Sequence, residues 1–119
     1  MYNNRITLKG NLTRDPDFKT IQSGGQDKEL VSFRIAVNEQ MGNGREETVY
    51  LDIDGWNHHV NYAKIVELSK GDRVIVDGRL KQRSWEDSNG SKRQSYSVNP
   101  ITFSKVVTPA KVSGSTESF

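Results

Sequence analysis

Residues 74–85 read VIVDGRLKQRSW, and their side chains alternate between two kinds. The even-numbered positions first carry apolar residues or glycine, namely Val74, Val76, Gly78 and Leu80. The odd-numbered positions (the other parity) become basic and then aromatic, namely Arg79, Lys81, Arg83 and Trp85. Because successive side chains of a β-strand point to opposite faces, this pattern predicts a half-buried strand. Its positive charge is therefore expected on a rigid surface rather than on a mobile tail.

The basic parity has the composition that single-stranded nucleic acid requires of a protein surface. Ammonium and guanidinium groups can follow a row of phosphates, and the flat ring of Trp85 can accept a stacked base. The alternative is an ordinary solvated strand face, since basic residues commonly cover exposed surfaces.

The composition of the chain limits the classes of function. Its 119 residues are enough for one domain with a modest core. With 17 basic and 15 acidic residues the net charge is only +2, so the distribution of charge has to select a partner. The chain has no cysteine, which excludes disulfides, thiolate zinc sites and a cysteine nucleophile. No apolar run is long enough for a signal peptide or a membrane span, and we expect a cytoplasmic protein.

Alternation also predicts three strands earlier in the chain, separated by polar or glycine-rich turns: 5–12, 30–38 and 48–56. The breaks are a proline turn at 14–17, a loop at Gly24-Gly25 and a hairpin loop at 41–45. Gly10 interrupts the first strand, as a bulge or a sharp barrel bend would.

A single helix is predicted over 57–69, with Asn57 as its N-cap and Lys70-Gly71 at its end. The strand at 72–85 follows, and an Asn-Gly turn at 87–90 leads to a last strand at 93–103 that Pro100 kinks.

Three strands, one helix and two strands, in that order, match a five-stranded Greek-key barrel of the oligonucleotide/oligosaccharide-binding (OB-fold) class. We therefore predict an all-β domain with one short helix over residues 1–105. Residues 106–119 lack alternation and are rich in small polar residues, so we expect a flexible tail there.

Two further aromatic residues, Tyr50 and Trp56, share the more polar face of the strand at 48–56 with Asp52 and Asp54. A ring on a polar face is harder to explain as core than a ring on an apolar one. We expect both rings to be exposed, unless a bulge near Gly55 reverses the assignment.

Three stretches of the chain resemble the family of bacterial-type single-stranded DNA-binding proteins. Residues 4–16, NRITLKGNLTRDP, are similar to the opening strand of that family and its Gly-x-Leu-x-x-Asp-Pro signature. Residues 33–38, FRIAVN, resemble its second strand, and residues 70–90 resemble its helix exit, fourth strand and hairpin almost throughout. The resemblance covers residues 3–105 in order and spacing as well as in residue type.

The resemblance implies sequence-independent binding and protection of single-stranded DNA in replication, recombination and repair, at the nucleoid. It implies that bases stack on Trp85, Trp56 and Tyr50, with packing of Tyr50 against the barrel rim or a neighbouring subunit as the alternative. It also implies a phosphate-contacting surface at seven basic positions: Arg79, Lys81, Arg83, Lys70, Arg34, Lys92 and Arg93. Finally, it implies a homotetramer, or at least a dimer paired through its first strands, which Arg5 and Lys9 could flank.

The chain departs from the family pattern at three places. Met41 stands where the family usually has another stacking aromatic residue. Asp52 and Asp54 put negative charge on the expected binding face, so either they point away from it or another subunit neutralises them. The last residues, Ser115-Thr116-Glu117-Ser118-Phe119, lack the acidic run through which the family recruits replication proteins, and we expect weak or no recruitment.

A nuclease site is the enzymatic alternative, because Asp52, Asp54 and His58-His59 offer metal-binding groups. Adjacent histidines on a helix point about 100° apart, however, and no third acidic ligand or activated nucleophile accompanies them. We therefore predict no enzymatic activity, no metal and no cofactor. Two other functions stay open: a primosome-type accessory protein with weaker single-strand binding, and an RNA-directed binder, since stacking does not detect the 2′-hydroxyl.

Overall fold

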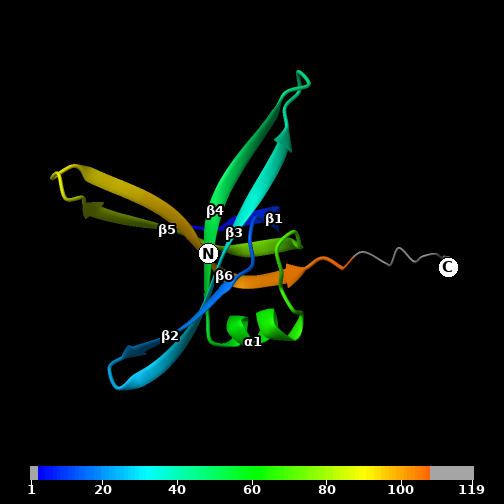
Figure 1. Cartoon of the computed structure of the whole chain (residues 1–119). Coiled ribbons are helices and arrows are strands. Elements are labelled where there is room, and N and C mark those ends of the chain that lie inside the picture. The colour runs from blue at the N-terminus through cyan, green and yellow to red at the C-terminus, as the bar shows by residue number, and fades with distance from the viewer. Residues whose placement is uncertain (1–2, 108–119) are drawn as a thin grey trace, which may run out of the picture.

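Strands account for most of the chain in the computed structural model, which describes residues 3–107 (Figure 1). In chain order the elements are β1 (Ile6–Leu12), β2 (Asp17–Ser23), β3 (Gln26–Gln40), β4 (Glu46–Trp56), α1 (His58–Ile65), β5 (Arg73–Glu86) and β6 (Lys92–Lys105). Within these residues no helix has the length and apolar character needed to cross a membrane.

Five of the strands close into a barrel. The sheet order is β1-β5-β6-β4-β3-β2, and an additional pairing of β1 with β3 joins its ends. β1 changes partner near Gly10, from β5 over Ile6–Asn11 to β3 at Asn11 and Leu12. A Cβ on Gly10 would lie only 2.5 Å from the carbonyl oxygen of Ala36, so this corner requires glycine. The predicted five-stranded barrel with one helix is confirmed, and Gly10 marks a barrel bend.

The prediction missed one strand, β2. It pairs with β3 from Asp17↔Ser32 to Ser23↔Gln26 and forms a two-stranded ribbon outside the barrel, with its turn at Gly24 and Gly25. The described side chains of β2 are exposed, so burial imposes no apolar alternation that a sequence pattern could reveal.

The helix is shorter than predicted. It begins after Asn57, as expected, but ends at Ile65 rather than at Ser69. Glu67 takes a positive φ of 53°, which breaks the helical turn, and the chain then returns Leu68 to the core.

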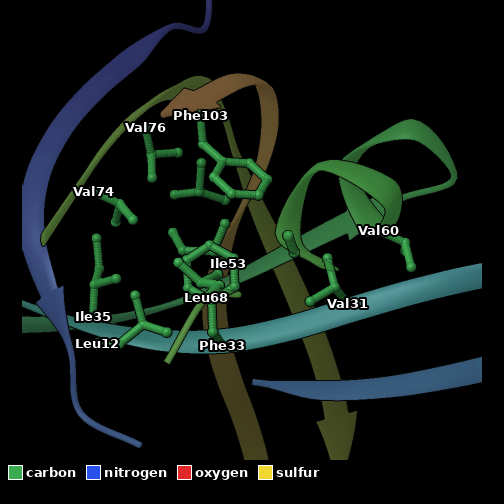
Figure 2. Close-up of a cluster of buried hydrophobic side chains, with 12 residues drawn as sticks. Leu12, Val31, Phe33, Ile35, Ile53, Val60, Leu68, Val74, Val76 and Phe103 are labelled. Atoms are coloured by element: carbon green, nitrogen blue, oxygen red, sulfur yellow. The ribbon is translucent and has the colours of Figure 1, made fainter. Parts of the chain in front are cut away.

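The core lies inside the barrel and is covered at one end by α1 (Figure 2). Six of its fully buried side chains have the apolar parity that alternation predicted: Val31, Phe33, Ile35, Ile53, Val74 and Val76. Val98 of β6 is also fully buried, and the sequence pattern did not single it out. α1 adds Val60 and Ala63, and Phe103 packs its ring 5.4 Å from that of Phe33.

Three hairpins extend from the barrel as arms, which we name the β2–β3 arm, the β3–β4 arm and the β5–β6 arm (Figure 1). On the β5–β6 arm every residue from Arg79 to Glu86 is exposed. The prediction that a buried apolar face backs the basic residues therefore holds only as far as Gly78, because Leu80 is already 37% exposed. The basic series stands on a projecting ribbon with solvent on both sides.

Candidate nucleic-acid interface

The outer surface of four neighbouring strands is continuous. Arg34 of β3 lies opposite Asp52 of β4, Asp52 lies opposite Ser97 of β6, and Ser97 lies opposite Lys81 of β5. Residues that face each other in register share one face of the sheet. Tyr50 and Trp56 on β4 therefore share their face with the basic residues of β5.

A groove of about 530 Å³ runs between β4 and the base of the β5–β6 arm. Trp56 lines it together with Lys81 and Arg83, and the residue is 36% exposed. The other lining residues are neutral or acidic: Leu30, Ser32, Asp54, Gln82, Ser97 and Asn99. An exposed indole and two cations, from segments far apart in the sequence, thus meet at one concave surface.

Trp85 lies further out on the β5–β6 arm, and the residue is 38% exposed. The guanidinium of Arg83 lies over its ring, 4.9 Å from the centroid, which is a cation–π contact. Trp85 also lines a second groove, of about 390 Å³, with Lys92 and Arg93 near the end of the arm. The arrangement presents an indole beside positive charge.

The turn at the end of this arm is held by Asp87. Its carboxylate accepts hydrogen bonds from the backbone N–H groups of Asn89 and Ser91 and from Nε of Arg93, at 2.9–3.0 Å. The hydrogen bond from Arg93, followed by the one from the Ser91 N–H, holds the pKa of Asp87 below its usual value. Arg93 therefore forms an ion pair with Asp87, whereas Lys92 forms no ion pair among residues 3–107.

The two carboxylates on the face have partners in the same chain. Arg34 Nη1 lies 2.9 Å from Asp52 Oδ1, and the same guanidinium lies 5.7 Å from the centre of the Tyr50 ring. Asp54 accepts a hydrogen bond from the hydroxyl of Ser32. Asp52 therefore does not point away from the face, and Arg34 of its own chain pairs with it, so a second subunit is not needed to neutralise it.

The structure distributes the remaining predicted residues unevenly. Tyr50 is 54% exposed, so about half of its surface is open to solvent in the single chain. Arg79 lies opposite Asn99 at the base of the same arm. Lys70 precedes the first residue of β5, whereas Trp85 lies near the last one. The length of the strand between its start and Trp85 is about 40 Å. The backbone N–H of Lys70 donates to Asp15, and the structure does not bring this residue to the groove.

Sequence reasoning missed the neutral lining of the groove. Leu30 and Ser32 share the parity of Arg34 on β3, which is a usable signal. Ser97 and Asn99 enter through the pairing of β4 with β6, and no local pattern reveals that pairing.

The alternative metal site finds no support in the described part of the chain, where no three potential ligands gather. His59 is buried, with its ring 4.0 Å from that of His58 and 5.6 Å from that of Phe103. Burial lowers the pKa of His59, and the neighbouring His58 acts in the same direction.

Comparison with known proteins gives concordant matches. The sequence model described as the single-strand binding protein family matches residues 3–105. The chain is 36% identical over 114 residues to a single-stranded DNA-binding protein of Thermus aquaticus, covering 94% of this chain and 41% of the relative. It is also 36% identical over 99 residues to one of Deinococcus radiodurans, covering 80% of this chain and 31% of the relative. The chain therefore spans well under half the length of these relatives. A solved Plasmodium falciparum SSB complex with ssDNA superposes with a TM-score of 0.72 at 25% identity, over 90% of this chain and 97% of that one.

Proposed function

The chain belongs to the single-strand binding protein family, and from this premise we propose that it binds single-stranded DNA without reading its base sequence. The observation that carries the proposal is the groove in which Trp56 lies beside Lys81 and Arg83, continued outward by Trp85. Every base offers a π-face and every nucleotide a phosphate, so rings flanked by cations bind any sequence. We assign this activity to residues 1–105, in support of replication, recombination and repair at the nucleoid.

The proposed roles divide by chemistry. Trp85, Trp56 and Tyr50 stack on bases, each contributing on the order of 1–3 kcal/mol. Six basic residues near these rings contact phosphates: Arg79, Lys81, Arg83, Lys92, Arg34 and Arg93. Arg34 and Arg93 are each shared with a carboxylate, so we expect smaller contributions from them. Lys70 stands apart from this surface and would contact only DNA that continues around the barrel.

Tryptophan fluorescence tests the proposal directly, because both indoles of the chain lie on the proposed surface. Adding oligo(dT) should quench the emission, and adding salt should reverse the quenching as the phosphate contacts are lost. The Trp56→Ala and Trp85→Ala variants should each bind more weakly. Unquenched emission together with no measurable binding would refute the proposed function. If the chain binds RNA oligomers as tightly as DNA oligomers, the function extends to single-stranded RNA.

Proteins of this family bind DNA without catalysing a reaction on it. For this chain we propose the same: binding without cleavage, and without a cofactor or metal. Labelled single strands incubated with the purified protein and Mg²⁺ or Mn²⁺ should stay intact. Protein-dependent cleavage that Asp52→Asn and Asp54→Asn abolish would contradict the proposal.

We also propose a homo-oligomer, a tetramer rather than a dimer. β1 pairs with β5 over Ile6–Asn11 but with β3 only at Asn11 and Leu12. Most of its second edge thus has no partner strand within residues 3–107, and such an edge can pair with a copy of itself. Native mass spectrometry would settle the state, and a monomer at concentrations that bind DNA would refute an oligomer.

The predicted lack of recruitment of replication proteins concerns residues 115–119, which lie outside the described residues. The same holds for the expected flexible tail at 106–119, apart from its first two residues. A pull-down with and without the last nine or so residues tests recruitment: loss of a replication partner on deletion would contradict the prediction.

A further inference from the structure

Among residues 3–107, Asp54 is the one acidic residue that lines the groove of Trp56. Asp54 and Trp56 are two positions apart on β4, so their side chains point to the same face of the sheet. Residues at this spacing on one strand are about 6.7 Å apart. A base that stacks on the ring of Trp56 therefore has a carboxylate beside it.

No cation of the described chain neutralises Asp54. Its Oδ1 accepts a hydrogen bond from the hydroxyl of Ser32, and it forms no ion pair among residues 3–107. Asp52, the other carboxylate of this face, differs because Arg34 pairs with it at 2.9 Å. An unpaired carboxylate repels phosphates, and its free lone pairs accept only from N–H or O–H donors. The group that fits beside Asp54 is therefore a hydrogen-bond donor without negative charge.

Charge is separated across the groove. β6 lies between β4 and β5 in the sheet, and its residues Ser97 and Asn99 line the groove with neutral side chains. Lys81 and Arg83 of β5 lie on the far side of β6 from Asp54. Phosphates are thus attracted to the β5 side and repelled from the β4 side, so we expect a bound nucleotide to place its backbone toward β5 and its base toward Asp54.

The position of Asp54 is fixed by its surroundings. The side-chain N–H of Asn99 donates to the backbone carbonyl of Asp54 at 3.0 Å. Gly55, the next residue, packs so closely on α1 that a Cβ there would lie 2.9 Å from Cβ of His59. The carboxylate is thus presented from a segment that is packed on one face and hydrogen-bonded along its edge, as selective recognition requires.

Guanine offers the donors that Asp54 requires. In a single strand the Watson–Crick edge of each base is accessible to a protein. The edge of guanine carries two adjacent donors, the N1–H and the 2-amino group. Adenine and cytosine each carry one amino group beside an acceptor nitrogen, and thymine carries one N–H between two carbonyl oxygens. Each carboxylate oxygen has two lone pairs, so the hydrogen bond from Ser32 leaves both oxygens of Asp54 able to accept from guanine.

We propose that the groove of Trp56 is a guanine-preferring subsite, in which the base stacks on Trp56 and its N1–H and 2-amino group donate to the carboxylate of Asp54. The inference rests on the proposed DNA-binding function and names the base that one position of the binding surface favours. Stacking and phosphate contacts do not require guanine, so the chain still binds every sequence. Asp54 is then a specificity-determining residue, and its repulsion of phosphates is offset when guanine is bound.

The test compares thymine oligomers of about 9 nucleotides that differ only in the central base. The central base is guanine in one oligomer and hypoxanthine, which lacks only the 2-amino group, in the other. Because both are purines, stacking is nearly the same and the ratio of the two affinities reports the hydrogen bond of the 2-amino group. The native chain should bind the guanine oligomer about 2- to 12-fold more tightly, as expected for one hydrogen bond in a groove open to solvent. Oligomers with adenine, cytosine or thymine at the centre should also bind more weakly than the guanine oligomer.

Asp54→Ala and Asp52→Ala form a matched pair of variants. Each removes one carboxylate from the same face of β4 and changes the net charge equally. Asp54→Ala should abolish the difference between the guanine and hypoxanthine oligomers, whereas Asp52→Ala should keep the native ratio. Thermal melting verifies that each variant is folded.

Three results would overturn the inference: equal affinity of the native chain for the guanine and hypoxanthine oligomers, an undiminished ratio in Asp54→Ala, or an equal loss of the ratio in Asp52→Ala. The first result needs no variant, so it decides the question even if Asp54→Ala fails to fold. Tight and equal binding of all the oligomers would remove only the guanine preference. Failure of all of them to bind would contradict the proposed function itself.

Discussion

Asp52→Asn is expected to strengthen the binding of single-stranded DNA, although it breaks an ion pair. Asp52 lies in the row that joins Arg34, Ser97 and Lys81, so its carboxylate stands in the proposed path of the phosphates. It also holds Arg34 at 2.9 Å. The substitution removes a repulsive charge and frees a guanidinium at the same point, and both changes favour phosphate.

The size of the effect follows from the exposure of the pair. The side chains of Arg34 and Asp52 are 39% and 47% exposed, so water already screens their attraction. Such a pair contributes about 0.2–1 kcal/mol, which bounds the loss of folding stability. One new phosphate contact of similar strength raises affinity about 1.4- to 5-fold and steepens the salt dependence by about 0.7.

The assay is a fluorescence titration with oligo(dT) at several salt concentrations. Glu47→Gln is the matched control, because it changes the net charge equally and releases Arg45 from a longer pair out on the β3–β4 arm. We expect the control to bind like the native chain. Weaker binding or an unchanged salt slope for Asp52→Asn would refute the release of Arg34, and an equal gain in the control would assign the effect to net charge alone.

Three further outcomes are expected. Gly78→Ala should lower the free energy of unfolding by about 1–3 kcal/mol in a urea titration, because its Cβ would overlap the backbone of β6, whereas Gly42→Ala, with open space around it, should not. Acidification below about pH 6.5 should lower the melting temperature, because burial makes the pKa of His59 lower in the folded state than in the unfolded state. The unfolded state then binds the proton first, so stability falls as the pH drops toward the folded-state pKa. If the melting temperature of His59→Leu depends on pH as that of the native chain does, His59 is not the responsible group. Arg83→Lys should keep the salt slope but weaken binding, because it retains the charge and loses the planar group over Trp85; unchanged affinity would show that this contact is dispensable.

Alternation predicted the barrel because burial imposes it. Inside the barrel one face of each strand packs against the core, so residues such as Phe33 and Val76 mark the inner face and their neighbours the outer one. The same constraint placed Trp56 and Tyr50 on the outer face. Where a strand leaves the barrel, both faces meet water and the pattern disappears, which is why β2 went undetected.

The partners of individual charges depend on register, which local patterns do not contain. Whether Asp52 repels DNA or is neutralised turns on the residue opposite it, and the β3–β4 pairing makes that residue Arg34. The end of α1 likewise depends on the positive φ of Glu67, a residue type with no preference for that conformation. The alternation of residues thus predicts which side chains share a face of the sheet. The pairing of the strands determines which charged groups on that face have no ion-pair partner and can contact DNA.

A net charge of only +2 is compatible with binding a polyanion because the distribution of charge, rather than its sum, sets the potential at the proposed surface. Arg34, Arg93 and Lys105 each face a carboxylate, so they add little to the field around the molecule. Lys81 and Lys92 have no such partner among residues 3–107, and they line the grooves of the exposed residues Trp56 and Trp85. The salt dependence of binding should therefore follow the number of these unpaired cations that a given oligomer reaches, and changes of net charge on the opposite faces of the arms should leave it unaltered.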